Sequence, residues 1–186
     1  KRGYTATNPC EQVEPIDVDW RPPAILAPEE CRKLMDTAAK VDPGLVPYLA
    51  LALFAGIRPN EIRRLTWQAV DLDAGHVTID PEAAKTRQRR LVPLNDPARA
   101  WLALGGDIPP RNMDARRVRI AEAAGITWTH DVLRHTAASY LLAIHQDAGK
   151  VSLWLGNSPT ILFRHYRELV KPTDAQAWLE IRPAMV

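Results

Sequence analysis

The sequence of 186 residues has little cysteine, no long apolar run and no large excess of charge of either sign. Its two cysteines, Cys10 and Cys31, belong neither to a Cys-x-x-Cys pair nor to a Cys/His cluster, so we expect reduced thiols and no zinc site. No stretch reaches the roughly 18 consecutive apolar residues of a membrane span, and no charged start precedes a secretion-type apolar core. We therefore expect neither a membrane protein nor a disulfide scaffold.

The charge balance is nearly even, with 24 Lys and Arg against 22 Asp and Glu, and does not by itself predict a nucleic-acid partner. The distribution is more informative. Segment 85–90 (KTRQRR) holds four positive charges and no negative one, and segment 111–119 (RNMDARRVR) is also rich in arginine. Each segment is consistent with a DNA-facing surface or with solvated arginines on an exposed face.

The chain divides into an irregular start and one domain. Residues 1–25 are rich in Pro, Asp and Glu without periodicity, which predicts a linker or entry arm. Residues 26–186 are long enough to form one domain with a hydrophobic core. Since the chain begins with Lys1 rather than Met, we expect a fragment of a longer protein.

Hydrophobic periodicity predicts a mainly α domain with a small antiparallel β-sheet (α+β). The almost wholly apolar segment 45–55 suits a buried central helix, and 76–80 and 89–94 form a hairpin with a long, basic tip. The other predicted helices are bounded by Pro, Gly and acidic residues. They span 27–40, a segment starting at Pro59, 97–104, 113–124, 131–144, 147–155, 159–169 and 173–180.

Four islands of sequence carry residues suited to phosphoryl chemistry. They are AGIRPNEIRRL (55–65) with Arg58, AAKTRQRRLVPL (83–94) with Lys85, THDVLRHTAASYLL (129–142) with His130, Arg134 and His135, and LGNSPTILFRHY (155–166) with Tyr166. A tyrosine hydroxyl can attack a phosphodiester and hold the product covalently. Arginine can grip phosphoryl oxygens with a fixed, bidentate geometry that lysine cannot mimic.

In this order the islands resemble the catalytic domain of the tyrosine recombinases, or phage-type integrases. GIRPNEI resembles the family's arginine-bearing helix start, and Lys85 followed by RRLVPL resembles its hairpin lysine and strand. HDVLRHT resembles its His-x-x-Arg-His box, and LGNS resembles the segment that precedes the nucleophilic tyrosine. Each motif alone is weak, but four in the family's order, over residues 25–182, are a strong indication.

The resemblance implies a DNA breaking-rejoining fold and a site-specific recombinase that joins DNA to Tyr166 as a 3′-phosphotyrosine. It implies that Arg58 and Arg134 clamp the phosphate and that Lys85 protonates the departing 5′ oxygen. It implies that His130 assists proton removal from Tyr166 and contacts the phosphate. It implies no metal ion and no nucleotide cofactor.

The sequence departs from the family pattern at the histidine of the third island. His130 lies four residues before Arg134, where the family spacing is three, and the residue three before Arg134 is Asp131. Positions three and four residues apart share a helix face, so His130 can still reach the site. Alternatively, Asp131 fills the family position or caps the helix that follows.

Two further positions admit more than one interpretation. Asn157 stands where many family members have histidine; its amide can donate a hydrogen bond to a phosphoryl oxygen but cannot shuttle a proton. We include Asn157 in the catalytic set. Glu61 either orients Arg58 or pairs with Arg64 one turn on.

The alternative to an active recombinase is a catalytically weakened, DNA-binding relative, and a third possibility is a helical interaction module with no role on DNA. The family implies double-stranded DNA as the partner, no membrane, and a cytoplasmic, nucleoid-associated location in a prokaryote or phage. It also implies an N-terminal core-binding domain that this chain lacks, and a tetramer on DNA at full length. For the isolated fragment we expect a monomer, with its tail (174–183) folded back rather than docked on a neighbour.

Overall fold

The computed structural model describes residues 22–82, 89–166 and 170–184, together with residues 8, 11, 13 and 14. Cys10, Lys85 and most of the predicted linker lie outside the described residues, as does the predicted end of helix 159–169. Cys31 is a free, buried thiol, and burial raises its pKa.

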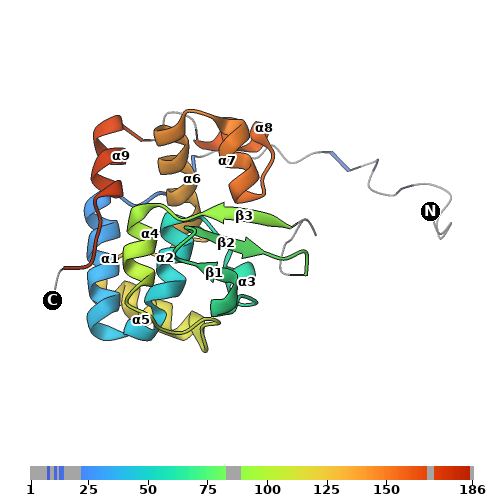
Figure 1. Ribbon diagram of the computed structural model, residues 1–186. Coiled ribbons are helices and arrows are strands. Elements are labelled where there is room, and N and C mark those ends of the chain that lie inside the picture. The colour runs from blue at the N-terminus through green and yellow to red at the C-terminus, as the bar shows by residue number, and fades with distance from the viewer. Residues whose placement is uncertain are drawn as a thin grey trace.

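Helices make up most of the described chain, and a small sheet lies beside them (Figure 1). The helices are α1 (Pro28–Val41), α2 (Val46–Phe54), α3 (Pro59–Ile62), α4 (Asp96–Leu102), α5 (Met113–Ala124), α6 (Val132–His145), α7 (Ala148–Leu155), α8 (Pro159–Tyr166) and α9 (Pro172–Leu179), with 3-10 turns η2 (Pro43–Leu45) and η3 (Trp67–Ala69). The strands are β1 (Val70–Asp71), β2 (His76–Ile79) and β3 (Arg90–Pro93). The predicted fold class, mainly α with a small antiparallel sheet, is confirmed.

The predicted central helix is α2, in which all nine residues are buried. It packs against α1, α4 and α6, so its apolar surface is covered on several sides. At its C-terminal end the chain turns through Gly56, which has a positive φ of 63°. A Cβ there would lie 2.4 Å from Leu155 of α7, so the close approach of α7 as well as the backbone conformation requires glycine. This turn delivers the first sequence island to the end of α7.

The sheet is antiparallel with strand order β1-β2-β3, and the predicted hairpin forms its β2–β3 pair. Val77 pairs with Val92, and both are buried. Strand β1 was not predicted from the sequence because two residues are too few to show an alternating pattern. Strand β3 contacts α7, so the sheet joins the helices where the fourth island begins (Figure 1).

The C-terminal tail folds back onto its own domain. Helix α9 packs against α1 and α6, and Trp178 is fully buried. The Trp178 ring stacks on Tyr140 with centroids 5.1 Å apart and lies 5.3 Å from the Phe54 ring. Beyond the helix, the carbonyl of Ile181 accepts a hydrogen bond of 3.1 Å from the Trp101 indole. Of the two alternatives for the tail, this chain therefore adopts the intramolecular one.

The arginine-rich segment 111–119 is largely committed to ion pairs within the protein. Arg116 donates to both carboxylate oxygens of Asp42, at 2.8 and 2.6 Å, and to Asp107 at 2.8 Å. Arg119 reaches Asp42 at 2.7 Å. These arginines hold the pKa of the Asp42 carboxyl below its usual value, against the effect of burial. Much of this segment's charge is thus neutralised locally rather than presented to a partner.

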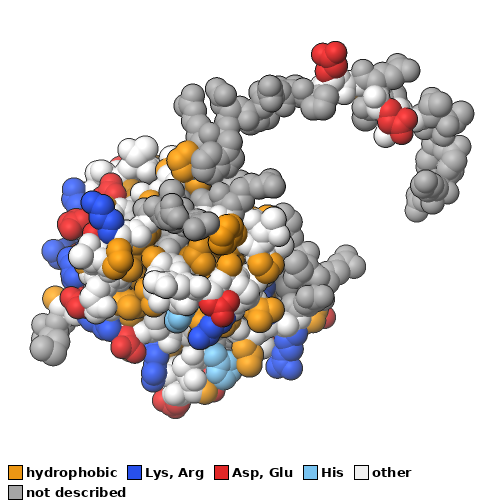
Figure 2. Space-filling model, turned by 90° about the horizontal axis from the view of Figure 1, so that it is seen from above, with side chains coloured by type: hydrophobic (Ala, Val, Ile, Leu, Met, Phe, Trp, Pro, Cys, Tyr) orange, Lys and Arg blue, Asp and Glu red, His pale blue; other side chains and the backbone are white. Residues whose placement is uncertain are grey.

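Figure 2 looks down on the end of the molecule formed by α6 to α9 and shows hydrophobic side chains at that surface. On α7 and α8, Leu153, Ile161 and Phe163 are exposed. Phe163 also lines a surface hollow that Tyr166 and Val170 border. Among the residues described, no helix combines the length and hydrophobicity needed to cross a membrane.

We expect Trp178→Ala to lower the free energy of unfolding by about 3–5 kcal/mol, because it empties a fully buried aromatic site between α2, α6 and α9. Urea denaturation measured by circular dichroism tests this. Leu153→Ala, on the exposed face of α7, is the control and should change stability by less than about 0.5 kcal/mol. Equal effects of the two substitutions would show that α9 contributes little to the core.

Candidate active site

Arg58 is positioned by the turn between α2 and α3. It has an extended backbone as the residue before α3, and Pro59 occupies the first helical position. Its backbone N–H donates to Glu61 at 3.1 Å, and its guanidinium donates to the same carboxylate at 3.2 Å. The first turn of α3 therefore fixes both the backbone and the side chain of Arg58.

Arg134 lies on α6 and is almost completely buried, with 5% of its surface exposed. Its guanidinium donates to the carbonyl of Gly56, to the carbonyl of Leu155 at 2.7 Å and to the Asn157 side chain at 3.1 Å. Burial, reinforced by the nearby charge of Arg58, lowers the pKa of Arg134 to about 9. The group remains a cation at neutral pH, and an anion brought next to it would be strongly stabilised.

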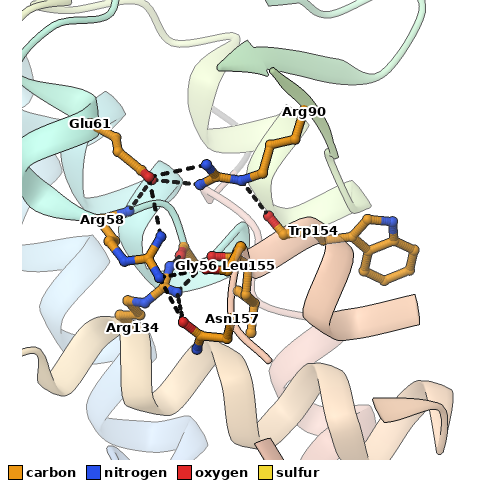
Figure 3. A network of polar contacts seen from close by, with 9 residues as sticks. Gly56, Arg58, Glu61, Arg90, Arg134, Trp154, Leu155 and Asn157 are labelled. Carbon is orange, nitrogen blue, oxygen red and sulfur yellow. Dashed lines mark hydrogen bonds and ion pairs between the residues drawn. The ribbon is translucent and has the colours of Figure 1, made fainter. Parts of the chain in front are cut away.

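Asn157 is the point at which the two arginines meet (Figure 3). Its side-chain oxygen accepts hydrogen bonds from Arg58 at 2.6 Å and from Arg134 at 3.1 Å. Helix α7 ends just before it at Gly156, whose positive φ of 63° turns the chain and whose carbonyl accepts from Arg58 at 2.8 Å. One oxygen thus receives two guanidinium groups, which is the arrangement that a non-bridging phosphoryl oxygen would occupy.

Glu61 supports this arrangement from the other side and is 1% exposed. Arg90 of β3 donates to both of its carboxylate oxygens, at 3.1 and 2.6 Å, and to the carbonyl of Trp154 at 2.9 Å (Figure 3). Burial alone would raise the pKa of Glu61, but Arg90 and Arg58 outweigh it and lower that pKa. Arg64 donates instead to the carbonyl of Glu82. Glu61 therefore orients Arg58, one of the two roles considered from the sequence.

The site carries more positive than negative charge. Among the described residues, Arg58, Arg90 and Arg134 face one carboxylate, that of Glu61, so these four side chains carry a net charge of +2. Buried charge without a matching counter-charge is unfavourable in the protein alone. An incoming phosphodiester would supply that counter-charge, in a position already lined with preorganised donors.

Tyr166 is the last residue of α8 and is 7% exposed. Its hydroxyl lies 2.7 Å from Nδ1 of His135 on α6, and the two rings are 5.7 Å apart. Burial raises the pKa of Tyr166, while the charges of Arg134 and Arg58 act to lower it. The phenol is consequently protonated at neutral pH, within electrostatic range of both arginines.

The remaining predicted site residues are His130, which is exposed, and Lys85, which lies outside the described chain. His130 is exposed over 93% of its side chain and is 3.6 Å from Asp131. It lines an open cleft with Arg58, whereas the described contacts of Tyr166 include His135 instead. Asp131 precedes α6 with a φ of 54° and makes no side-chain cap. Lys85 falls outside the described residues.

The structure adds two residues that sequence reasoning did not assign to the site, Arg90 and His135. Arg90 was counted as part of a basic segment and of the RRLVPL strand but was given no role in the site. Its alternation with Val92, which places it on the inward face of the strand, was a usable signal. His135 was named beside Arg134 in the third island but was given no catalytic role, because the sequence did not distinguish it from a histidine at the edge of the core. Its role depends on where α8 packs.

The sequence model of the Phage integrase family matches residues 24–104. The sequence relatives include tyrosine recombinases, and the similar solved structures are recombinases and integrases, so the chain has the fold of their catalytic domains. Among its relatives is tyrosine recombinase XerC of Xanthomonas campestris pv. campestris (strain B100), 29% identical over 203 residues. That match covers 94% of this chain and 62% of the relative, so the chain spans less than two thirds of that protein.

Solved structures show the same fold at lower identity. XerA recombinase has a TM-score of 0.69 at 19% identity, covering 92% of this chain and 68% of that one. A lambda integrase dimer bound to a COC′ core site has a TM-score of 0.63 at 18% identity, covering 91% of this chain and 69% of that one. The described fold is therefore that of a tyrosine recombinase catalytic domain.

We expect Glu61→Gln to lower the free energy of unfolding by about 3–5 kcal/mol, because it leaves Arg58 and Arg90 without their buried counter-charge. Chemical denaturation at neutral pH measures the effect. Asp114→Asn is a matched control, because Asp114 is exposed and its ion pairs with Arg63 and Arg117 each contribute at most about 1 kcal/mol. A loss below about 1 kcal/mol for Glu61→Gln would contradict a stabilising role of the carboxylate.

The difference in stability between wild type and Glu61→Gln should depend on pH. The pKa of Glu61 is lower in the folded protein than in the unfolded chain, so its stabilising contribution is present above the ordinary carboxyl range and is lost as pH falls through the folded value. The stability difference between wild type and Glu61→Gln should therefore shrink below about pH 4. A difference that stays constant down to pH 2 would show that charge is not its origin.

Proposed function

We propose that this chain is the catalytic part of a site-specific DNA recombinase, or integrase, that cleaves and rejoins DNA strands through a 3′-phosphotyrosine at Tyr166. The observation that carries the proposal is the convergence of Arg58 and Arg134 on a single oxygen, that of Asn157. The tyrosine lies on α8, and α8 packs against the helix that carries Arg134. The names of the sequence relatives support the same chemistry.

In the proposed reaction the Tyr166 oxygen attacks the phosphorus, and the bond from phosphorus to the 5′ oxygen breaks. Arg58 and Arg134 donate to the non-bridging oxygens, on which negative charge builds up in the transition state. Lys85, from the basic hairpin tip, gives a proton to the departing 5′ oxygen. A free 5′ hydroxyl then attacks the phosphotyrosine, which restores the DNA bond and the tyrosine without an external source of energy.

Asn157 and His130 have secondary roles in this proposal. The Asn157 side chain accepts hydrogen bonds from both arginines, and its amide can donate to the phosphate once the arginines turn to the phosphoryl oxygens. His130 lines the same open cleft as Arg58, and 93% of the His130 side chain is exposed. From that rim it can contact a DNA phosphate.

The proposed partner is double-stranded DNA. The proposed location is the cytoplasm, in association with the nucleoid. The lambda integrase with this fold was solved as a dimer bound to a core site. We propose that the longer protein has an N-terminal core-binding domain that closes around DNA and that it acts as a tetramer. The isolated chain is proposed to be a monomer, since α9 packs on its own α1 and α6. Without the proposed core-binding domain it is expected to bind DNA weakly.

We expect Tyr166→Phe to abolish the covalent protein–DNA adduct because it removes the attacking oxygen. Nicked duplexes from the ends of the element that carries the gene are incubated with protein and resolved on a denaturing gel. Tyr140→Phe is the matched control, because its hydroxyl bonds only to the carbonyl of Leu26 among the described residues, and it should still form adduct. An adduct that persists in Tyr166→Phe would exclude Tyr166 as the nucleophile.

Arg58→Lys and Arg134→Lys should each slow adduct formation by about 100- to 1000-fold, because an ammonium cannot reproduce the guanidinium geometry. DNA affinity is measured in parallel as a function of salt, since phosphate contacts give a steep salt dependence. Wild-type protein that binds DNA with such a slope but forms no adduct would favour the catalytically weakened relative. The comparison is repeated with protein that carries the proposed N-terminal core-binding domain, which is expected to strengthen DNA binding.

A further inference from the structure

The contact between His135 and Tyr166 suggests a chemical role for a histidine outside the predicted catalytic set. We propose that His135 accepts the proton of the Tyr166 hydroxyl during cleavage and returns it during rejoining. The proposal rests on the recombinase function proposed above. It concerns the residue that directly follows Arg134, not the histidine at the start of the third island.

The geometry favours a fixed, functional contact. Nδ1 of His135 lies 2.7 Å from the Tyr166 oxygen, within the range of a good hydrogen bond. The backbone of His135 is held by α6: its N–H donates to the carbonyl of Asp131 at 2.8 Å, and its carbonyl accepts from the Ser139 hydroxyl at 2.9 Å. Because the next residue toward the N-terminus is the buried Arg134, the proton acceptor and the phosphate clamp are fixed by the same helical turn.

The chemistry of the surrounding groups requires such an acceptor. Burial keeps the Tyr166 phenol protonated at neutral pH, so a base must remove its proton as the new bond forms. The clamp consists of guanidinium groups, which are already protonated and cannot accept it. The Asp131 charge acts on Tyr166 only through space in the described contacts, and His130 points into the open cleft.

The proton balance is simple. Neutral His135 with its proton on Nε2 presents the Nδ1 lone pair to the Tyr166 hydroxyl. As the tyrosine oxygen bonds to phosphorus, its proton moves to Nδ1, and the departing 5′ oxygen takes a separate proton from Lys85. In rejoining, the tyrosine oxygen leaves phosphorus and recovers the proton from Nδ1. His135 therefore ends each cycle neutral.

The first test needs no DNA. Nitrogen-15 NMR of the wild-type chain gives the tautomer of His135, and the signal is assigned by its loss in His135→Asn. An unprotonated Nδ1 that accepts the tyrosine hydrogen bond is the expected result. A neutral ring with the proton on Nδ1 would donate to Tyr166 instead and would overturn the proposal.

The second test is single-turnover cleavage of a nicked duplex. Asparagine keeps a hydrogen-bonding side chain but cannot take a proton, so His135→Asn should cut the cleavage rate by about 100-fold or more. DNA affinity and melting temperature should stay close to wild type. His76→Asn on β2 is the control and should leave the rate unchanged. A His135→Asn rate within threefold of wild type would overturn the proposal.

A duplex with sulfur in place of the 5′ bridging oxygen separates the two proton transfers. A thiolate leaves without protonation, so this substrate should restore cleavage by Lys85→Ala but not by His135→Asn. Restored cleavage by His135→Asn would assign the histidine to the leaving group and overturn the proposal. If wild type forms no adduct on duplexes it binds, the recombinase function itself fails, and the tautomer measurement still decides whether His135 accepts from Tyr166.

Discussion

The buried carboxylate of Glu61 is the interaction on which the site's geometry depends. It joins the start of α3 to β3 through Arg58 and Arg90, and Arg90 continues the link to the end of α7 through the carbonyl of Trp154. Three segments that are far apart in the sequence are thus connected through the Glu61 carboxylate and the Arg90 guanidinium. Because the carboxylate is removed from water, its contacts have to be satisfied by the protein, which restricts the positions that these segments can take.

This constraint explains how the fold can keep an excess of positive charge at its centre. Glu61 compensates part of the charge of Arg58 and Arg90, whereas Arg134 is paired only with carbonyl groups and with Asn157 among its described contacts. A fully compensated site would be more stable but would have no electrostatic preference for a phosphate. The arrangement fits a site whose remaining charge is balanced by its substrate, as expected where stability is traded for activity.

Much of the fold followed from local pattern. The apolar segment 45–55, the hairpin and the helix over 113–124 agree with the structure to within a residue or two, because burial and turn residues at those positions leave few alternatives. Strand β1 was not predicted, because two residues are too few to show an alternating hydrophobic pattern. In the site, the sequence pointed to Arg58, Arg134 and Asn157, which the structure brings together, but it left the roles of Glu61 and Arg90 unresolved. Both depend on contacts between distant segments.

The sequence by itself determined the kind of chemistry and the elements that carry it, because residue type, order and periodicity are local properties of the chain. Only the tertiary structure decided which cation Glu61 orients, where α9 docks and which histidine meets Tyr166. His130 precedes α6 and His135 lies in its first turn, and the choice between them is made by the packing of α8 against α6. Such contacts are set by how distant, individually buried surfaces fit together, and no local pattern encodes that fit.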